Sequence, residues 1–208
     1  MSKTRSNTPR PDRRPDTLAS KMSQSFQRTD FAALIVERAS TPHAPAWMAD
    51  AQSKDASARK SAREMYERCL EIYRTVVRPQ DTKYDDAGAA LAFFVAMNLS
   101  ALHDLPATPA VLLLLERQLL GLARRVSGWD SASISQRQFY FEEMAMLGAF
   151  MAGLADKARS EGVTARVKVR ETARLYLHHL LGMDPDLLTF GEHGLVLRPA
   201  SDEAHRTA

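Results

Sequence analysis

The chain contains few of the residues from which covalent and metal-centred sites are built. It has one cysteine, Cys69, so an internal disulfide bond is impossible. It also lacks a Cys-x-x-Cys pair, a Gly-x-Ser-x-Gly nucleophile elbow and a glycine-rich phosphate loop. Because these patterns mark the common redox, hydrolase and nucleotide-binding sites, we expect no catalytic residue and no cofactor, and we interpret the chain as a non-enzymatic protein.

Long hydrophobic runs are also absent. The longest segment without a charged residue, 87–102, includes Asn98 and Ser100 and is too short for a membrane span. Residues 1–30 are rich in arginine, serine and proline, and they contain no apolar segment of the kind that a Sec signal peptide requires. We therefore expect a cytoplasmic protein without a membrane span. Export by a non-Sec route, or a periplasmic protein if the true start differs, is the alternative.

Acidic residues are scarce only near the N-terminus. Residues 1–30 contain seven lysine or arginine residues and three acidic ones, whereas the remaining 178 residues contain 21 basic and 22 acidic groups. The net charge of +3 therefore belongs to an N-terminal arm, and the nearly neutral body is not expected to bind nucleic acid. Because large apolar side chains are few there, we predict a disordered basic arm and linker over residues 1–50, extended over 40–55, with a short helix near 30–39.

Apolar residues recur at helical spacing through most of the remaining chain. The clearest stripe follows alternating steps of three and four residues: Leu112, Leu115, Leu119, Leu122 and Val126. Similar patterns predict helices over residues 56–77, 85–103, 135–160 and 164–182. We therefore predict an all-α, five- to six-helix bundle-like domain over residues 56–198, followed by a polar tail, 199–208. The apolar segments 187–190 and 195–197 either pair as a short hairpin or lie extended on the bundle.

Two of the predicted helices carry further information about packing. Segment 85–103 is apolar nearly all round, so we expect it to be the central and most buried helix. In segment 56–77 the inner stripe is expected to consist of Ala62, Met65, Cys69, Tyr73 and Val76. Cys69 on this stripe is expected to act as a small buried hydrophobe.

The ends of the helices are marked by residues with known capping preferences. Thr108 followed by Pro109 predicts the start of the leucine-rich helix. The other expected signals are the acids Asp85 and Asp86 at the start of the central helix, a capping box of Ser135 with Gln138, a cap at Thr164 and a stop at Gly182.

Two pairs of adjacent polar residues are the obvious candidates for a site. His178 and His179 point about 100° apart on a helix, so they cannot chelate one metal together. Either could join His103 or the pair Glu142–Glu143 from another helix, but no metal-ligand spacing supports this and no metal site is predicted. Both glutamates are expected on the polar side of their helix.

One loop aromatic suggests a binding surface. Trp129 lies in a Gly-Trp-Asp-Ser loop, where it is either tucked under the bundle or offered to another chain. Aromatic residues are enriched at interface hot spots. We therefore predict that Trp129, Phe190 and Leu195 form an apolar, partner-binding patch at one end of the domain.

Three parts of the sequence share a pattern with other proteins. They are the alanine- and aromatic-rich segment 85–94, the segment 138–144, and the closing segments 181–184, 187–190 and 194–196. Together, over about residues 84–197, they resemble a family of uncharacterised bacterial helical proteins, many of which carry export signals. The resemblance implies a helical fold and an export route, and it implies no activity.

These observations lead to two hypotheses of function. The first is a non-enzymatic protein-binding or assembly protein of bacterial origin, which binds a protein partner or associates with itself. The alternative is a secreted effector or cargo protein whose N-terminal arm is an uncleaved secretion signal.

Overall fold

A computed structural model describes residues 34–78, 84–126, 128–182, 184–191 and 193–197. Its α-helices are α2 (Ala44–Gln52), α3 (Ala56–Ile72), α4 (Ala87–His103), α5 (Pro109–Val126), α6 (Ile134–Glu161) and α7 (Val163–Leu181). Short segments are the π-helix η1 (Tyr73–Val77), the 3₁₀ turns η2 (Trp129–Ser131) and η3 (Pro185–Leu187), and the strands β1 (Ile35–Glu37), β2 (Tyr84–Asp86), β3 (Leu188–Gly191) and β4 (Gly194–Leu197). The all-α prediction is confirmed. The predicted arm before residue 34 and the predicted polar tail lie outside the described residues.

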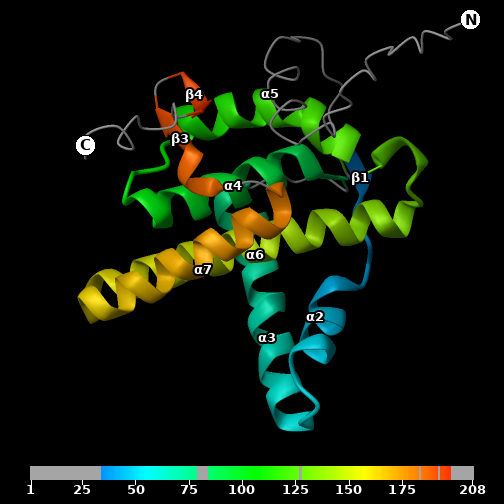
Figure 1. The fold of residues 1–208 in the computed structure, drawn as a ribbon. Coiled ribbons are helices and arrows are strands. Elements are labelled where there is room, and N and C mark those ends of the chain that lie inside the picture. Colours follow the sequence, from blue (N-terminus) through cyan, green and yellow to red (C-terminus); the bar gives the residue numbers. More distant parts are fainter. Residues whose placement is uncertain (1–33, 79–83, 127, 183, 192, 198–208) are drawn as a thin grey trace, which may run out of the picture.

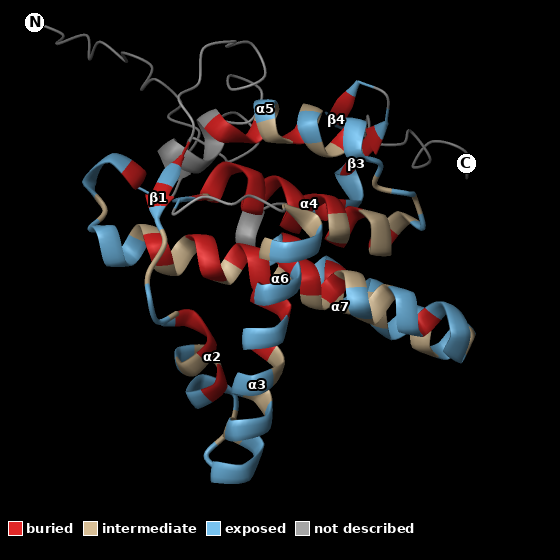
Figure 2. Cartoon of the chain, turned by 180° about the vertical axis from the view of Figure 1, so that it is seen from behind, coloured by how far each residue is buried: buried red, intermediate tan, exposed pale blue. Residues whose placement is uncertain are grey.

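Helix α4 is the centre of the core, as its composition predicts. Thirteen of its 17 residues are buried, and Figure 2 shows it as a buried element between α5 on one side and α6 and α7 on the other. The Asp86 side chain caps it by accepting from the N–H groups of Gly88 and Ala89 at 2.9 and 3.1 Å. Helix α6 crosses it closely at Gly148, where an added Cβ would lie 2.6 Å from the Phe93 ring. Glycine is therefore required there.

The leucine-rich helix α5 covers the opposite side of α4. Leu115 and Leu119 are fully buried, and the Thr108 hydroxyl accepts from Val111 N at 3.3 Å, so the predicted start is confirmed. The hairpin alternative for the C-terminal segment is also confirmed, since β3 and β4 pair antiparallel with Phe190 opposite Leu195. Gln118 of α5 fixes the hairpin by accepting from Leu195 N at 2.7 Å.

Helix α3 departs from the predicted stripe where it becomes the π-helix η1. Cys69 and Tyr73 are buried as expected, and burial raises the pKa of the Cys69 thiol. Val76, however, is 72% exposed, so its assignment to the inner stripe is wrong. A π-helix has a wider turn than an α-helix, so residues after Tyr73 are rotated out of the α-helical phase from which the stripe was extrapolated.

Residues 34–52 belong to the folded body, which corrects the expected boundary near residue 56. Leu34 and Val36 are in the core, and β1 pairs antiparallel with β2 where a short helix was expected. The expected extended linker contains α2, which packs against α3 and α6. Trp47 on α2 is 58% exposed and meets the Phe139 ring edge-on at 5.2 Å. The contacts that place this segment are formed with residues far away in the sequence.

Two predicted helix starts are displaced. The cap of helix α6 lies two residues earlier than expected, because Ser133 and Gln136 form the capping box and not Ser135 and Gln138. The sequence repeats the same Ser-x-x-Gln spacing at both places, so the pattern alone did not distinguish them. Helix α7 is preceded by Gly162 with no side-chain cap, so Thr164 is not its cap. Gly182 ends α7 in the left-handed conformation, as predicted.

The helices form a layered body with two projections (Figure 1). Helix α5 and the β3–β4 hairpin lie above α4, and α6 and α7 lie side by side beneath it. The α2–α3 pair projects downward from α6, and the joined ends of α6 and α7 project to the left in the view of Figure 1. No helix within the described ranges is long and apolar enough to cross a membrane.

Candidate functional site

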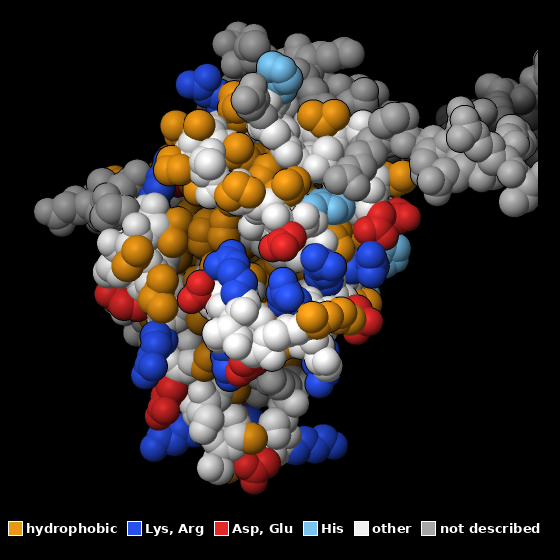
Figure 3. All heavy atoms as spheres, turned by 90° about the vertical axis from the view of Figure 1, so that its left-hand side faces the viewer, with side chains coloured by type: hydrophobic (Ala, Val, Ile, Leu, Met, Phe, Trp, Pro, Cys, Tyr) orange, Lys and Arg blue, Asp and Glu red, His pale blue; other side chains and the backbone are white. Residues whose placement is uncertain are grey.

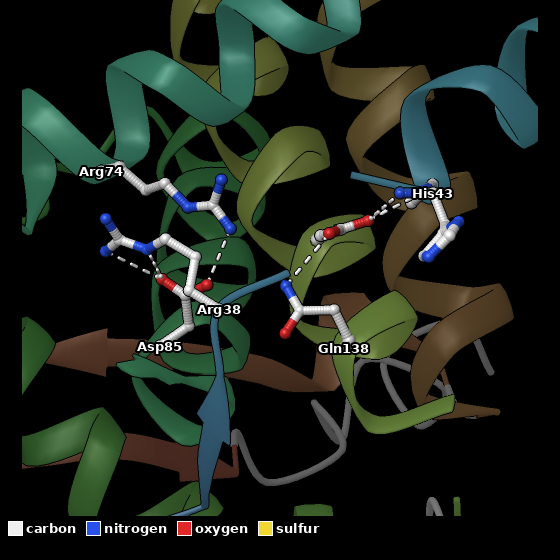
Figure 4. Close-up of polar contacts among 7 residues, drawn as sticks. Arg38, His43, Arg74, Asp85 and Gln138 are labelled. Atoms are coloured by element: carbon white, nitrogen blue, oxygen red, sulfur yellow. Dashed lines mark hydrogen bonds and ion pairs between the residues drawn. The ribbon is translucent and has the colours of Figure 1, made fainter. Parts of the chain in front are cut away.

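Buried charges gather where β1, β2 and η1 meet. The Asp85 carboxylate is buried and accepts from Arg38 Nε at 3.2 Å and from an Arg74 guanidinium nitrogen at 2.7 Å (Figure 4). The Arg74 guanidinium also lies 5.4 Å from the centre of the Phe141 ring. Asp85 therefore does not help to cap α4 as expected. It ties β2 to β1 and to the π-helix.

A neighbouring pair extends this network to α5. Arg78 contacts Glu116 at 2.9 and 3.3 Å and lies 3.7 Å from the Asp86 carboxylate. Together with the Asp85 contacts, three arginines face three acids, so the charges balance within the network. A balanced and internally paired network of this kind is a structural connection, because it leaves no net charge to attract a ligand.

Glu142 is buried, although it was expected on the polar side of its helix. It is fully buried, and its hydrogen bonds place its carboxylate between the start of α2 at His43 and Gln138, which are labelled in Figure 4. One oxygen accepts from the backbone N–H groups of His43 and Ala44 at 2.8 and 2.9 Å, and the other accepts from Gln138 Nε2 at 3.0 Å. Glu142 thus caps α2 from another helix, where the positive end of the helix dipole also favours a carboxylate. The prediction that it lies on a polar face is wrong.

Glu143 takes part in neither of these networks. It lines a hollow of about 230 Å³ between α4, α6 and α7, together with Phe94, Met144, Leu147, Tyr176 and His179. It also lines an adjoining hollow of about 380 Å³ against the turn before α6, where Trp129, Arg137, Phe139 and Tyr140 contribute. Because the two hollows share Glu143 and follow one face of α6, we call them together the α6 groove.

The electrostatics of the α6 groove centre on this carboxylate. Burial raises the pKa of Glu143, and no described residue forms a hydrogen bond or ion pair with it. Burial also raises the pKa of the Tyr140 hydroxyl, and the nearby Glu143 charge raises it further. A partly buried carboxylate without a counter-ion is unfavourable in the free protein, so a cation brought into the groove would be stabilised there.

The structure brings together only part of the polar set considered from the sequence. Both histidines are exposed, but only His179 lines the α6 groove with Glu143; the two rings meet edge-on with their centres 6.3 Å apart. His103 is elsewhere, with its Nε2 2.7 Å from the carbonyl oxygen of Leu188. In the part of the chain that the structure describes, no three His, Cys, Asp or Glu side chains are placed to hold a metal ion.

The apolar patch expected from Trp129, Phe190 and Leu195 is not an exposed surface. The three side chains are 5%, 6% and 3% exposed. Phe190 and Leu195 face each other in the hairpin, whereas the turn that holds Trp129 lies beside β1 at the other end of α5 (Figure 1). Trp129 packs edge-on against Tyr140 at 6.1 Å and forms part of the α6 groove wall. Of the three predicted residues, only Trp129 borders this candidate site.

A second surface feature is basic. Figure 3 shows lysine and arginine side chains gathered where the ends of α6 and α7 meet. Arg159, Arg166 and Arg170 line a shallow depression there together with Asp104. Arg159 is already paired with Asp156 at 3.0 Å, and the depression encloses only about 20 Å³. Since its charges are partly compensated and exposed, the α6 groove is the stronger candidate.

The α6 groove is built by residues that no motif connects. Its charged, aromatic and apolar residues come from α4, α6, α7 and η2, and helical spacing explains only those within α6. Because Glu142 and Glu143 are adjacent, the sequence does not indicate that Glu142 is a buried cap and Glu143 lines a hollow. Only the packing of α2 against one side of α6 distinguishes them.

Comparison with known proteins places the chain in a family. No curated protein and no solved structure matches the chain. A family model matches residues 2–198, which include the basic arm as well as the helical body. The resemblance recognised over residues 84–197 therefore extends over nearly the whole chain. The chain belongs to DUF6683, a family of unknown function.

Proposed function

We propose that this protein is a non-enzymatic protein-binding protein of bacterial origin and that the α6 groove receives a side chain of its partner. The observation that carries the proposal is the Glu143 carboxylate, which has no hydrogen-bond or ion-pair partner among the described residues and lies where a mainly apolar hollow joins a mixed polar and aromatic one. Concave sites with apolar walls and few polar groups are typical of binding sites. The other buried charges are used in holding β1 and α2 to the body.

The walls of the groove suit a protein partner. Tyr176, Phe139 and Tyr140 offer aromatic surface, and the exposed imidazole of His179 forms part of the rim. Aromatic side chains supply much of the binding energy at protein interfaces. A side chain inserted into the groove would bury these rings and pair with Glu143, while the rim contacts the surrounding partner surface.

The test places a photo-crosslinking residue at His179 and, in a control protein, at Lys60, which is exposed on α3. A partner that crosslinks from position 179 and not from position 60 is identified by mass spectrometry and purified. The affinity of this partner is then measured by calorimetry for the wild-type chain, for Glu143→Arg and for the control Glu71→Arg. Glu71 is exposed on α3.

We expect Glu143→Arg to weaken binding by at least about tenfold at an unchanged melting temperature, and Glu71→Arg to have little effect. Equal affinity for both variants would show that the partner does not bind in the groove. The alternative function, a secreted effector with the arm as its signal, remains a hypothesis; it requires that the arm alone directs a fused reporter out of the cell.

A further inference from the structure

Within the described part of the chain, no cationic side chain pairs with the Glu143 carboxylate. Arg137 is the cation that lines the groove, and its guanidinium lies 5.4 Å from the Trp129 ring and donates to the carbonyl oxygens of Ala132 and Asp130 at 3.1 and 3.4 Å. These contacts hold Arg137 on the turn before α6. His179 shares the smaller hollow with Glu143 but forms no ion pair with it among the described residues. Glu143 therefore has no counter-ion in the groove among the residues that the structure describes.

The surroundings of this charge are apolar and aromatic. Met144 and Leu147 follow Glu143 along α6, and Phe94 and Tyr176, whose ring centres are 6.4 Å apart, form the wall beyond them. Tyr140 lies on the opposite side of Glu143, close enough for the Glu143 charge to raise the pKa of its hydroxyl. Aliphatic and aromatic walls contact a hydrocarbon chain, and aromatic faces also attract a cation.

We infer that the α6 groove selects an alkylammonium group, as carried by a lysine side chain of the partner, with the ammonium paired to Glu143 and the hydrocarbon stem on Met144 and Leu147. The inference rests on the proposed function and names the chemistry of the group that the groove receives. A lysine side chain has both required parts, a flexible apolar stem and a terminal point charge with three donors.

Other ligand classes fit less well. An anion would approach an unpaired carboxylate in a partly desolvated site, where like charges repel more strongly than in water. A neutral hydrocarbon would bury the apolar walls but would leave the carboxylate further desolvated and still unpaired. An alkylammonium removes both costs, because it pairs with the carboxylate while covering the walls.

The experiment uses the full chain and small probes, so it does not depend on knowing the partner. Pentylammonium, 1-pentanol and pentanoate are titrated separately at pH 7 and followed by two-dimensional NMR of the backbone amides. We expect pentylammonium to bind with a dissociation constant on the order of 1–10 mM and to shift the amides near Glu143 and Tyr176. The two other probes should bind at least about tenfold more weakly.

The matched variants are Glu143→Gln, which keeps the size of the side chain and removes its charge, and Glu71→Gln on the exposed face of α3. Glu143→Gln should weaken pentylammonium binding by about tenfold and leave pentanol binding unchanged, while Glu71→Gln should change neither. A melting temperature of Glu143→Gln at or above the wild-type value shows that the loss of binding comes from the site and not from unfolding.

Two results overturn the inference. One is that pentanol binds as tightly as pentylammonium or that Glu143→Gln binds pentylammonium like the wild type. The other is that pentylammonium gives no saturable shift in the groove. If a partner still crosslinks from position 179 in either case, the proposed function survives and only the choice of ligand is wrong. If pentylammonium binds but no partner enters the groove, the proposed function fails instead.

Discussion

Replacing Glu142 with alanine removes the acceptor for two backbone N–H groups at the start of α2, those of His43 and Ala44. It also removes the acceptor for Gln138, whose side chain is buried. Hydrogen bonds to a charged group contribute about 1.5–3 kcal/mol each, and buried donors left without a partner cost about 1–3 kcal/mol each. Because α2 can partly unwind and expose its N–H groups to water, we expect a net loss of about 3 kcal/mol in the free energy of unfolding.

The glutamine variant separates the charge of Glu142 from its hydrogen bonds. In Glu142→Gln the new amide oxygen can accept from the start of α2. Its amide nitrogen can donate to Gln138 Oε1, which is buried without a partner in the wild-type structure, if that side chain turns over. Since the hydrogen bonds are then largely kept, we expect Glu142→Gln to lose only about 1 kcal/mol.

The assay is urea unfolding followed by far-UV circular dichroism, with amide hydrogen exchange to locate the change. Exchange should accelerate in α2 for Glu142→Ala, because its first N–H groups lose their acceptor. The adjacent Glu143→Ala is the control, since Glu143 has no hydrogen-bond partner among the described residues; its effect should stay within about 0.5 kcal/mol. Equal losses for the two alanine variants, or a loss below about 1 kcal/mol for Glu142→Ala, would refute the cap.

Four further measurements test the packing and the electrostatics. Phe94→Ala removes a fully buried ring and should cost about 3–5 kcal/mol in urea unfolding; a loss below about 1 kcal/mol would mean that α4 is not the centre of the core. Trp129→Ala should also lower the melting temperature, since Trp129 is buried; an unchanged melting temperature would show that Trp129 is a surface residue. Because burial raises the pKa of Glu143, its ionisation opposes folding: the stability that this group contributes is fully present below its unfolded pKa and is lost as pH rises through the folded pKa. Glu143→Gln should therefore be more stable than the wild type at pH 7 and lose that advantage below pH 4.5, whereas a pH-independent difference would contradict the burial. The composition of the arm predicts that limited proteolysis cuts before the buried Leu34, and early cleavage within α2 would show that residues 34–52 are not part of the stable body.

The sequence determined the features that depend on neighbours along the chain. The nearly all-apolar composition of segment 87–102 made α4 the buried centre, because no face of that helix can remain in water without a large cost. The starts at Asp86 and Thr108 and the stop at Gly182 followed from local capping chemistry. The capping box of α6 shows where this reasoning ends, since two overlapping Ser-x-x-Gln patterns were equally good and only one forms.

Tertiary structure decided the roles of the charged residues and the boundary of the body. Glu142 and Glu143 are chemically identical neighbours, yet one caps a helix whose first residue is 98 positions away and the other lines an open groove. Residues 34–52 were expected to form a short helix and an extended linker, and they are held to the body by Asp85 and Glu142, which lie outside the segment. A hydrogen bond between distant residues leaves no periodicity in the sequence. Its stability depends on how two helix faces meet, so the assignments that rested on single polar residues were decided only by the packed structure.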